Sequence, residues 1–159
     1  MSDREMTDRE MTVEEGIRGL CEGESFAVLA TQGQGQPYAS LIGFATSPDL
    51  KHLVFATPKQ TRKYTLLEED NRVALLVDNR ASQPGSINHL SALTITGKGK
   101  ILSEEEERAH WGKLLTDKHP YLMDFVASDA TAVVVVEVYR YFYVRRFQEV
   151  TEWNPGQPM

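Results

Sequence analysis

The fold is decided by residues 53–78, which read LVFATPKQTRKYTLLEEDNRVALLVD. The stretch Leu53–Ala56 is apolar and β-prone, and it predicts a short strand. Residues 61–70 have the spacing of a helix, which Asn71 can end. Residues 72–78 form a near-continuous apolar run, which predicts a strand buried on both faces. The segment therefore predicts a strand, a helix and a second strand in that order.

Two more strands are predicted before this segment. Ser25–Thr31 is β-prone, Gln32–Gln36 contains two glycines and predicts a turn, and Pro37–Thr46 reads as the returning strand. Parallel strands need crossover connections of a dozen or more residues. The tight spacing therefore predicts that these two strands and Leu53–Ala56 form an antiparallel meander.

Two long β-prone segments are predicted after it. Leu90–Leu102 contains Gly97 and Gly99, which indicate a bulge or bend of the kind that closes a barrel. Thr131–Phe147 is rich in β-branched and aromatic residues. The tail from Thr151 has few signals of regular structure.

Helices are predicted outside the barrel. Thr12 with Glu15, and Ser103 with Glu106, each fit the capping box that starts a helix. The second of these helices is expected to run to about Thr116. Together with residues 61–70, the pattern predicts a mainly β (α+β) fold, namely an antiparallel split β-barrel of six or seven strands with three peripheral helices.

Length and composition exclude several classes of protein. With 159 residues the chain is one domain in size, and we expect a flexible tail over residues 1–11 and a single domain over 12–159. The chain holds 17 basic and 23 acidic residues, a net charge of −6, so net charge gives no affinity for nucleic acid. The longest apolar run, Ala132–Val136, is far too short to span a membrane.

The cellular setting follows from what the sequence lacks. No N-terminal stretch combines a basic segment with an apolar one, so no secretory signal is indicated and a cytoplasmic location is expected. Cys21 is the only cysteine, which excludes an intrachain disulfide and a cysteine-based metal cluster. It lies on the apolar stripe of the first helix, where we interpret it as a small core residue.

The helix over residues 61–70 has its charges reversed. Helix starts favour acids and helix ends favour bases, yet Lys59, Arg62 and Lys63 crowd the start, and residues 68–70 are all acidic. A bound anion such as phosphate would remove this conflict, with Thr57 and Thr61 as additional hydroxyl donors. The alternative is that these cations are simply solvated.

The order of several motifs resembles one known family. The motifs are, in chain order, Gly35-Gln36-Pro37, Leu53–Thr57, Thr61-Arg62-Lys63, Asn71–Leu76, Thr94–Leu102 with Gly97, Tyr141–Tyr143 and Phe147–Trp153. From about Ser25 onward, the chain resembles the FMN-binding split-barrel family related to pyridoxamine 5′-phosphate oxidase. The resemblance implies a homodimer that binds two FMN molecules in clefts between the subunits.

The resemblance also implies positions for the cofactor. Arg62 and Lys63 match the family's phosphate-binding pair, and Thr61 stands where the family has a serine. The strand Ser40–Ala45 would run beside the isoalloxazine ring, and Ala56 and Thr57 would line the phosphate and ribityl end. The implied cofactor-binding residues are Ser40, Leu41, Ile42, Gly43, Ala56, Thr57, Thr61, Arg62 and Lys63. No metal site is expected.

Three departures argue against pyridoxine phosphate oxidation. Ser40 and Ala45 stand where the oxidase carries Arg and Lys, and Ala92 stands where its second subunit supplies Gln. The tail Thr151–Pro155 lacks the oxidase's Arg-rich substrate motif. The prediction is therefore an FMN-dependent oxidoreductase or flavin carrier of unknown substrate, with no catalytic side chain assigned.

Two alternative functions stay open. One is haem binding in haem utilisation, for which the four histidines are candidate ligands, and the other is a non-enzymatic flavin or deazaflavin module. The histidines are His52, His89, His110 and His119. Tyr38, Tyr64 and Trp153 are candidate ring-stacking groups that we interpret as core aromatics.

Overall fold

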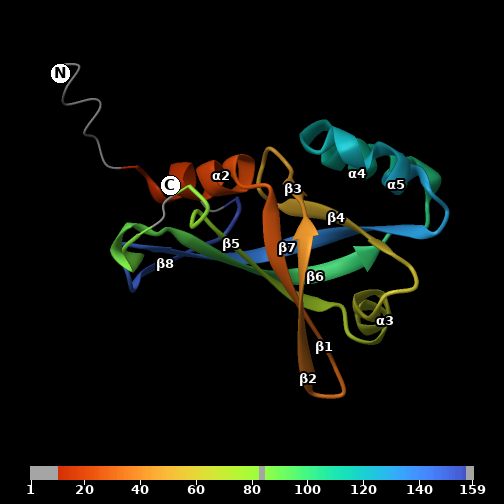
Figure 1. Ribbon diagram of the computed structural model, residues 1–159, viewed down its shortest axis with the longest axis horizontal. Coiled ribbons are helices and arrows are strands. Elements are labelled where there is room, and N and C mark those ends of the chain that lie inside the picture. The colour runs from red at the N-terminus through yellow and green to blue at the C-terminus, as the bar shows by residue number, and fades with distance from the viewer. Residues whose placement is uncertain (1–10, 83–84, 157–159) are drawn as a thin grey trace.

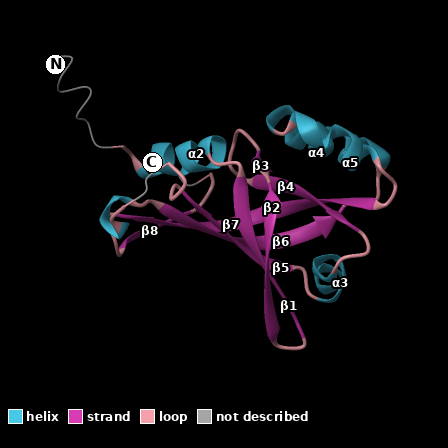
Figure 2. Cartoon of the chain, in the orientation of Figure 1, coloured by secondary structure: helices cyan, strands magenta, loops and turns pink. Residues whose placement is uncertain are grey.

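A computed structural model describes residues 11–82 and 85–156 (Figure 1). The predicted tail over residues 1–11 lies almost wholly outside the described residues. The chain folds into one mostly antiparallel sheet that curls into a half-barrel, with helices packed around it (Figure 2). This confirms the predicted fold class.

The sheet contains eight strands in the order β2-β1-β5-β6-β7-β4-β3, and β8 pairs with β7. The strands are β1 Phe26–Gly33, β2 Gln36–Gly43, β3 Ala45–Thr46, β4 His52–Pro58, β5 Arg72–Asp78, β6 Ala92–Ile101, β7 Thr131–Arg145 and β8 Glu149–Trp153. The sequence predicted six or seven. The difference arises because β3 is only two residues long and because the tail forms β8, which pairs with β7 and buries Trp153.

The predicted meander is confirmed, with a break in its second strand. Strands β1 and β2 do form a hairpin, whose turn residues Gln34 and Gly35 have φ of 54° and 78°, as a two-residue hairpin turn requires. The predicted strand Pro37–Thr46 is interrupted at Phe44, and its last two residues form β3, which pairs antiparallel with β4. The pairing of β4 with β7 on its other side was not predicted. β4 therefore lies inside the sheet, between β3 and β7, and its residues Leu53–Phe55 are buried on both faces.

Strand β5 is buried on one face only, so the prediction of a doubly buried strand is wrong. Val73, Leu75 and Val77 face the core, whereas Leu76 on the opposite face is 39% exposed. The near-continuous apolar run predicted burial on both faces, but the second face of β5 forms part of an apolar outer surface.

Four α-helices accompany the sheet within residues 11–82 and 85–156. They are α2 Val13–Gly23, α3 Arg62–Glu69, α4 Glu105–Lys118 and α5 Met123–Ala127. Thr12 caps α2 as predicted, accepting a hydrogen bond from the Glu15 backbone N–H at 3.1 Å. The predicted cap at Ser103 is wrong, because Glu104 is the N-cap of α4 and makes no side-chain cap bond. Three acidic residues in the first turn of α4 interact favourably with the helix dipole instead.

The core has two parts. One fills the half-barrel, where α2 packs against the inner face of the sheet, and the other lies between β4, β7 and the helices α4 and α5. The predicted bulge is confirmed, because the β6–β7 register shifts between Thr96 and Gly97. Burial raises the pKa of Tyr141, whose hydroxyl donates to the Leu50 carbonyl at 2.7 Å.

Cys21 is expected to resist thiol reagents. It is 1% exposed, and burial raises the pKa of its thiol from 9.0 to about 12. We expect negligible reaction with Ellman's reagent at pH 8 in the native state and stoichiometric reaction after unfolding.

The same pKa shift has a consequence at high pH. The unfolded chain loses this proton near pH 9, whereas the folded chain keeps it to about pH 12. The contribution of this thiol to stability is therefore complete below pH 9 and is lost as pH rises toward 12. Fast labelling of the native protein at pH 8 would contradict the assignment of Cys21 to the core.

Candidate functional site

The start of α3 is built by two threonines. Thr61 is the N-cap, and its hydroxyl accepts from the Tyr64 backbone N–H at 3.3 Å and donates to the Pro58 carbonyl at 2.8 Å. The buried Thr57 hydroxyl lies 3.0 Å from that of Thr61. The two hydroxyls predicted as anion donors thus hold the loop between β4 and α3 in place.

The reversed charges of α3 are present in the structure. Its first turn contains no acid and its last turn no base. Within residues 11–82 and 85–156, none of Lys59, Arg62 and Lys63 forms an ion pair. The acidic end is different, because Arg72 lies 2.7 Å from Asp70 and holds the pKa of that carboxyl well below its usual range. In the part of the chain that the structure describes, the acidic end therefore has one counter-charge and the cationic end has none.

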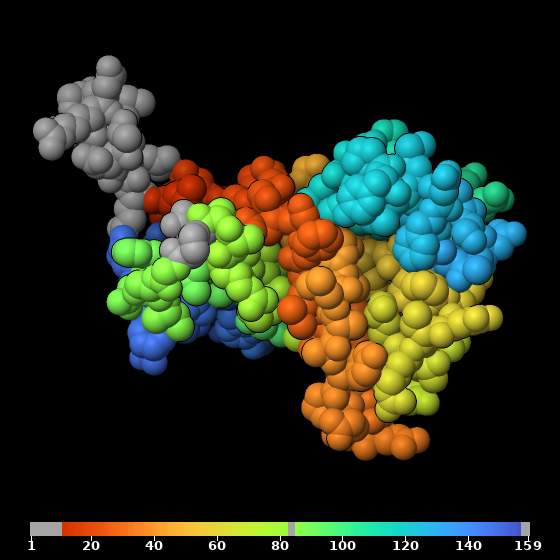
Figure 3. Space-filling model, viewed as in Figure 1, coloured from red at the N-terminus to blue at the C-terminus, as the bar shows by residue number. Residues whose placement is uncertain are grey.

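A hollow of about 470 Å³ lies between α3 and the β1–β2 hairpin. Thr61 and Arg62 line it together with Gln34 at the hairpin turn. Figure 3 shows the hairpin, in orange, beside α3, in yellow and yellow-green. Lys59 lines a different hollow, which it shares with Tyr64 and Asp129. Lys59 and Arg62 therefore line different hollows.

The predicted ring-flanking residues lie farther along β2. The strand alternates, so that Ile42 is 5% exposed whereas Leu41 is 68% exposed. The Ser40 hydroxyl oxygen is buried and has no hydrogen-bond partner among the described residues. Strand β2 contacts β4, which carries Ala56 and Thr57. A buried hydroxyl without a partner is costly, and a polar atom of a ligand beside β2 would satisfy it.

His119 fixes the end of β2, a role that the sequence did not predict. The ring is 2% exposed, with Nε2 at 2.9 Å from the Phe44 carbonyl and Nδ1 at 3.1 Å from the Tyr121 hydroxyl. Because a carbonyl only accepts, Nε2 carries the proton and Nδ1 accepts from Tyr121. The sequence offered this histidine only as a candidate haem ligand, because no local pattern marks its partner 75 positions away.

Lys118, the neighbour of His119, ties α4 to the end of α2. Its Nζ donates to the carbonyls of Cys21 at 2.8 Å and Glu24 at 2.6 Å, and it lies 3.9 Å from the centroid of the Phe44 ring. Burial lowers the pKa of Lys118 to about 8. These bonds place α4 and its C-terminal histidine firmly against the segment after β2.

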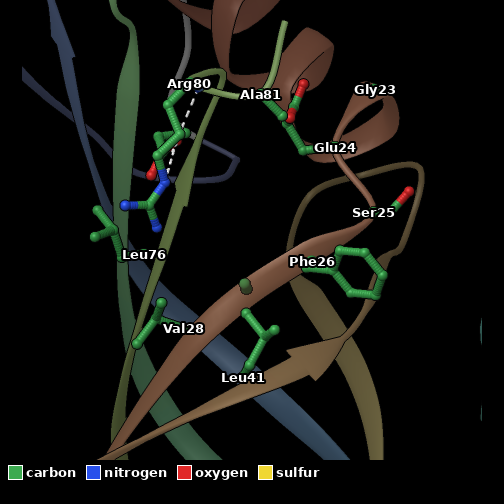
Figure 4. A pocket seen from close by; sticks show the side chains of 11 residues that line it. Gly23, Glu24, Ser25, Phe26, Val28, Leu41, Leu76, Arg80 and Ala81 are labelled. Atoms are coloured by element: carbon green, nitrogen blue, oxygen red, sulfur yellow. Dashed lines mark hydrogen bonds and ion pairs between the residues drawn. The ribbon is translucent and has the colours of Figure 1, made fainter. Parts of the chain in front are cut away.

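A second hollow lies on the outer face of the sheet, with a volume of about 340 Å³. Figure 4 shows Phe26, Val28, Leu41 and Leu76 around it, and Arg80 above them. The Arg80 side chain is paired with Asp78 at 3.2 Å. The near-continuous apolar run over residues 72–78 was the sequence signal for this face, and it predicted burial on both faces instead.

The candidate aromatic residues and histidines differ in their exposure and in their neighbours. Trp153 is a core residue as interpreted, at 7% exposure, whereas Tyr38 is 38% exposed, and the Arg62 guanidinium carbon lies 5.6 Å from its ring centroid. His52 and His110 both pack near Trp111. Among the described residues, no group of three or more His, Cys, Asp and Glu side chains is placed to hold a metal ion.

The fold and the cationic α3 define a split-barrel protein of a known family. A sequence profile described as "Pyridoxamine 5'-phosphate oxidase" matches residues 13–145. The chain therefore belongs to the pyridoxamine 5′-phosphate oxidase family. A search of curated proteins gave no match.

Several solved structures share the fold. A heme binding protein from Mycobacterium smegmatis superposes with a TM-score of 0.80 at 16% identity, over 92% of this chain and 60% of that one. ChuZ from Campylobacter jejuni gives 0.78 at 11% identity, over 98% and 70%. A FAD-binding protein from Mesorhizobium loti gives 0.64 at 16%, over 84% and 94%.

These likenesses establish the architecture. This chain spans only 60% of the length of the M. smegmatis protein. Over the described residues, every helix is too short or too polar to cross a bilayer.

Proposed function

We propose that this protein binds FMN and acts as an oxidoreductase or flavin carrier on a substrate other than pyridoxine phosphate. The observation that carries the proposal is the start of α3, where Arg62 and Lys63 lack counter-charges in a protein of the pyridoxamine 5′-phosphate oxidase family. A phosphate group there would meet two cations and the free backbone N–H groups of the helix start.

The remaining predicted residues fit a flavin that extends from α3 along β2. The buried hydroxyl of Ser40 supports a polar ligand atom beside that strand, because the protein itself satisfies it nowhere in the described chain. Backbone groups of Leu41, Ile42 and Gly43 would flank the ring, while Ala56 and Thr57 would line the ribityl end. His119 would hold the end of β2 in place through the Phe44 carbonyl.

The chemistry in this proposal is supplied by the cofactor, since a bound flavin accepts and donates one or two electrons. The side chains of this chain bind the phosphate, orient the ring and exclude water. No acid or base is assigned to the reaction.

A titration with FMN and with riboflavin tests the proposal. We expect purified apo-protein to quench flavin fluorescence saturably, with FMN bound at least tenfold more tightly than riboflavin, because riboflavin lacks the phosphate. Absence of saturable FMN binding would remove the proposal. Equal affinities for FMN and riboflavin would show that the phosphate does not bind at the start of α3.

We also propose that the protein is a homodimer whose second copy covers the outer face of β2, β1 and β5. Leu41, Val28 and Leu76 lie side by side in the strand register on this face, and Leu41 and Leu76 are 68% and 39% exposed. Exposed apolar side chains clustered in this way are typical of an interface.

The Leu41→Lys variant is expected to convert the dimer to a monomer, because it places a charge in the middle of that apolar face. Light scattering coupled to gel filtration measures the change. The control Val150→Lys changes an apolar residue that is 59% exposed on β8, a strand that pairs with β7 and lies outside this face, and it is expected to stay dimeric. A wild-type protein that is monomeric at 100 μM would contradict the dimer.

Haem is the second candidate ligand, because one structure with this fold is a heme binding protein. His89 and His110 are exposed, and within the described residues neither imidazole forms a hydrogen bond, so each ring nitrogen is accessible to iron. A Soret band that saturates on haem titration, together with absent FMN binding, would favour this candidate. Selective binding of a deazaflavin would favour a non-enzymatic flavin module.

A further inference from the structure

We propose that Tyr38 is a positioning residue that holds the Arg62 guanidinium in place for the phosphate of the ligand. This inference rests on the proposed function and goes beyond it, because Tyr38 acts through Arg62 and need not touch the cofactor. The guanidinium carbon of Arg62 lies 5.6 Å from the centroid of the Tyr38 ring. A cation at this distance over an aromatic face is attracted to it.

Arg62 depends on this ring for its orientation. Among the described residues Arg62 makes no ion pair and no side-chain hydrogen bond, and it is exposed at the first position of α3. A free arginine side chain loses conformational entropy when it binds a ligand. Stacking on Tyr38 restricts the side chain beforehand and leaves the N–H groups at its edge free to donate. Lys63 has no aromatic partner of this kind in the described structure.

Tyr38 can serve as a platform because the β1–β2 hairpin is fixed against α3. In the register Tyr38 lies opposite Thr31, whose buried hydroxyl donates to the Tyr38 carbonyl at 3.4 Å. Next to it, the Gln32 side-chain amide donates to Asp70 at 3.0 Å, at the far end of α3.

A third point holds the hairpin close. Gly33 packs so tightly against Leu66 and Glu69 that the space would not admit a β-carbon without a shift of those side chains. The hairpin therefore touches both ends of α3, with Arg62 over Tyr38 at the start and Gln32 bonded to Asp70 at the end. The distance between Tyr38 and Arg62 is set by the fold.

Two substitutions separate the ring from its hydroxyl. Tyr38→Leu removes the aromatic face, and Tyr38→Phe keeps it. We expect Tyr38→Leu to weaken FMN about threefold to fivefold, the size of an exposed cation–π contact. We expect Tyr38→Phe to stay within about 1.5-fold of the wild type. Riboflavin affinity should be unchanged in both variants, because it has no phosphate for Arg62 to bind.

A double-mutant cycle shows whether Tyr38 acts through Arg62. In an Arg62→Ala background, Tyr38→Leu should cause no further loss of FMN affinity. In the apo-protein, the NMR signal of the Arg62 Nε–H should carry a ring-current shift that Tyr38→Leu removes and Tyr38→Phe keeps. The spectrum also shows whether each variant is folded.

Several results would overturn the inference. Equal weakening of FMN and riboflavin by Tyr38→Leu would make Tyr38 a structural or ring-contacting residue. If Tyr38→Leu still weakens FMN binding in the Arg62→Ala background, Tyr38 does not act through Arg62. Wild-type protein that binds FMN in preference to riboflavin, with Tyr38→Leu unchanged, would overturn this inference alone. Wild-type protein that binds no FMN would overturn it together with the proposed function.

Discussion

Replacing Arg62 and Lys63 together by alanine is expected to weaken FMN binding about 100-fold or more. Each charge-assisted hydrogen bond to a phosphate contributes about 1.5–3 kcal/mol, and about 1.4 kcal/mol is a factor of ten in affinity. Neither cation has a counter-charge in the described protein, so removing them should cost the fold little. Riboflavin affinity should change less than twofold. Equilibrium titration by flavin fluorescence measures both ligands.

A matched control removes two positive charges elsewhere. Lys98→Ala with Lys100→Ala changes the net charge by the same amount on β6, where both side chains are exposed. We expect that variant to bind FMN almost as the wild type does, apart from a small long-range effect of net charge. If both double variants weaken FMN equally, the start of α3 is not the phosphate site.

Gly97→Ala is expected to lower the free energy of unfolding by about 3 kcal/mol or more, or to prevent folding. A β-carbon at Gly97 would collide with the backbone carbonyl oxygen of Glu137 on the neighbouring strand. Backbone cannot move aside as a side-chain end can, and this is where the β6–β7 register shifts. The long β6–β7 pairing would have to open locally. Urea denaturation followed by circular dichroism measures the loss.

The control for this prediction is Gly19→Ala. Gly19 lies in α2, and a β-carbon there would meet no atom within 4 Å. The substitution should stabilise the protein by up to about 1 kcal/mol, because alanine favours a helix over glycine. A Gly97→Ala variant with an unchanged denaturation midpoint would mean that the bulge has room for a side chain.

The parts of the fold that depend on local signals were predictable. The helix start at Thr12, the hairpin at Gln34-Gly35 and the bulge near Gly97 each follow from a short pattern. The second partner of β4 was not predictable, because strand pairing between β4 and β7 joins segments more than 70 positions apart and no local pattern encodes it. The exposed face of β5 was missed for a related reason, since an apolar run does not say what covers it.

The candidate site, like the fold, was predictable only where it depends on local sequence. The cationic start of α3 was visible in the sequence, because charges on a short helix depend on local spacing alone. The platform under Arg62 was not, since Tyr38 reaches it from a different element. The role of His119 was also missed, because only the folded chain brings its ring to the Phe44 carbonyl. The residues that position this site come from distant segments of the chain and cannot be found from local sequence. The residues that carry its charge are close together in the sequence and can be.

The central claim is that the native ligand is FMN. Its most direct test is to purify the protein from cells grown without added flavin, denature it, and identify the released small molecules by mass spectrometry. We expect FMN, at a level approaching one per chain after incubation with excess FMN and removal of the unbound cofactor. Release of haem or a deazaflavin in its place, or no flavin retained even after that incubation, would contradict it.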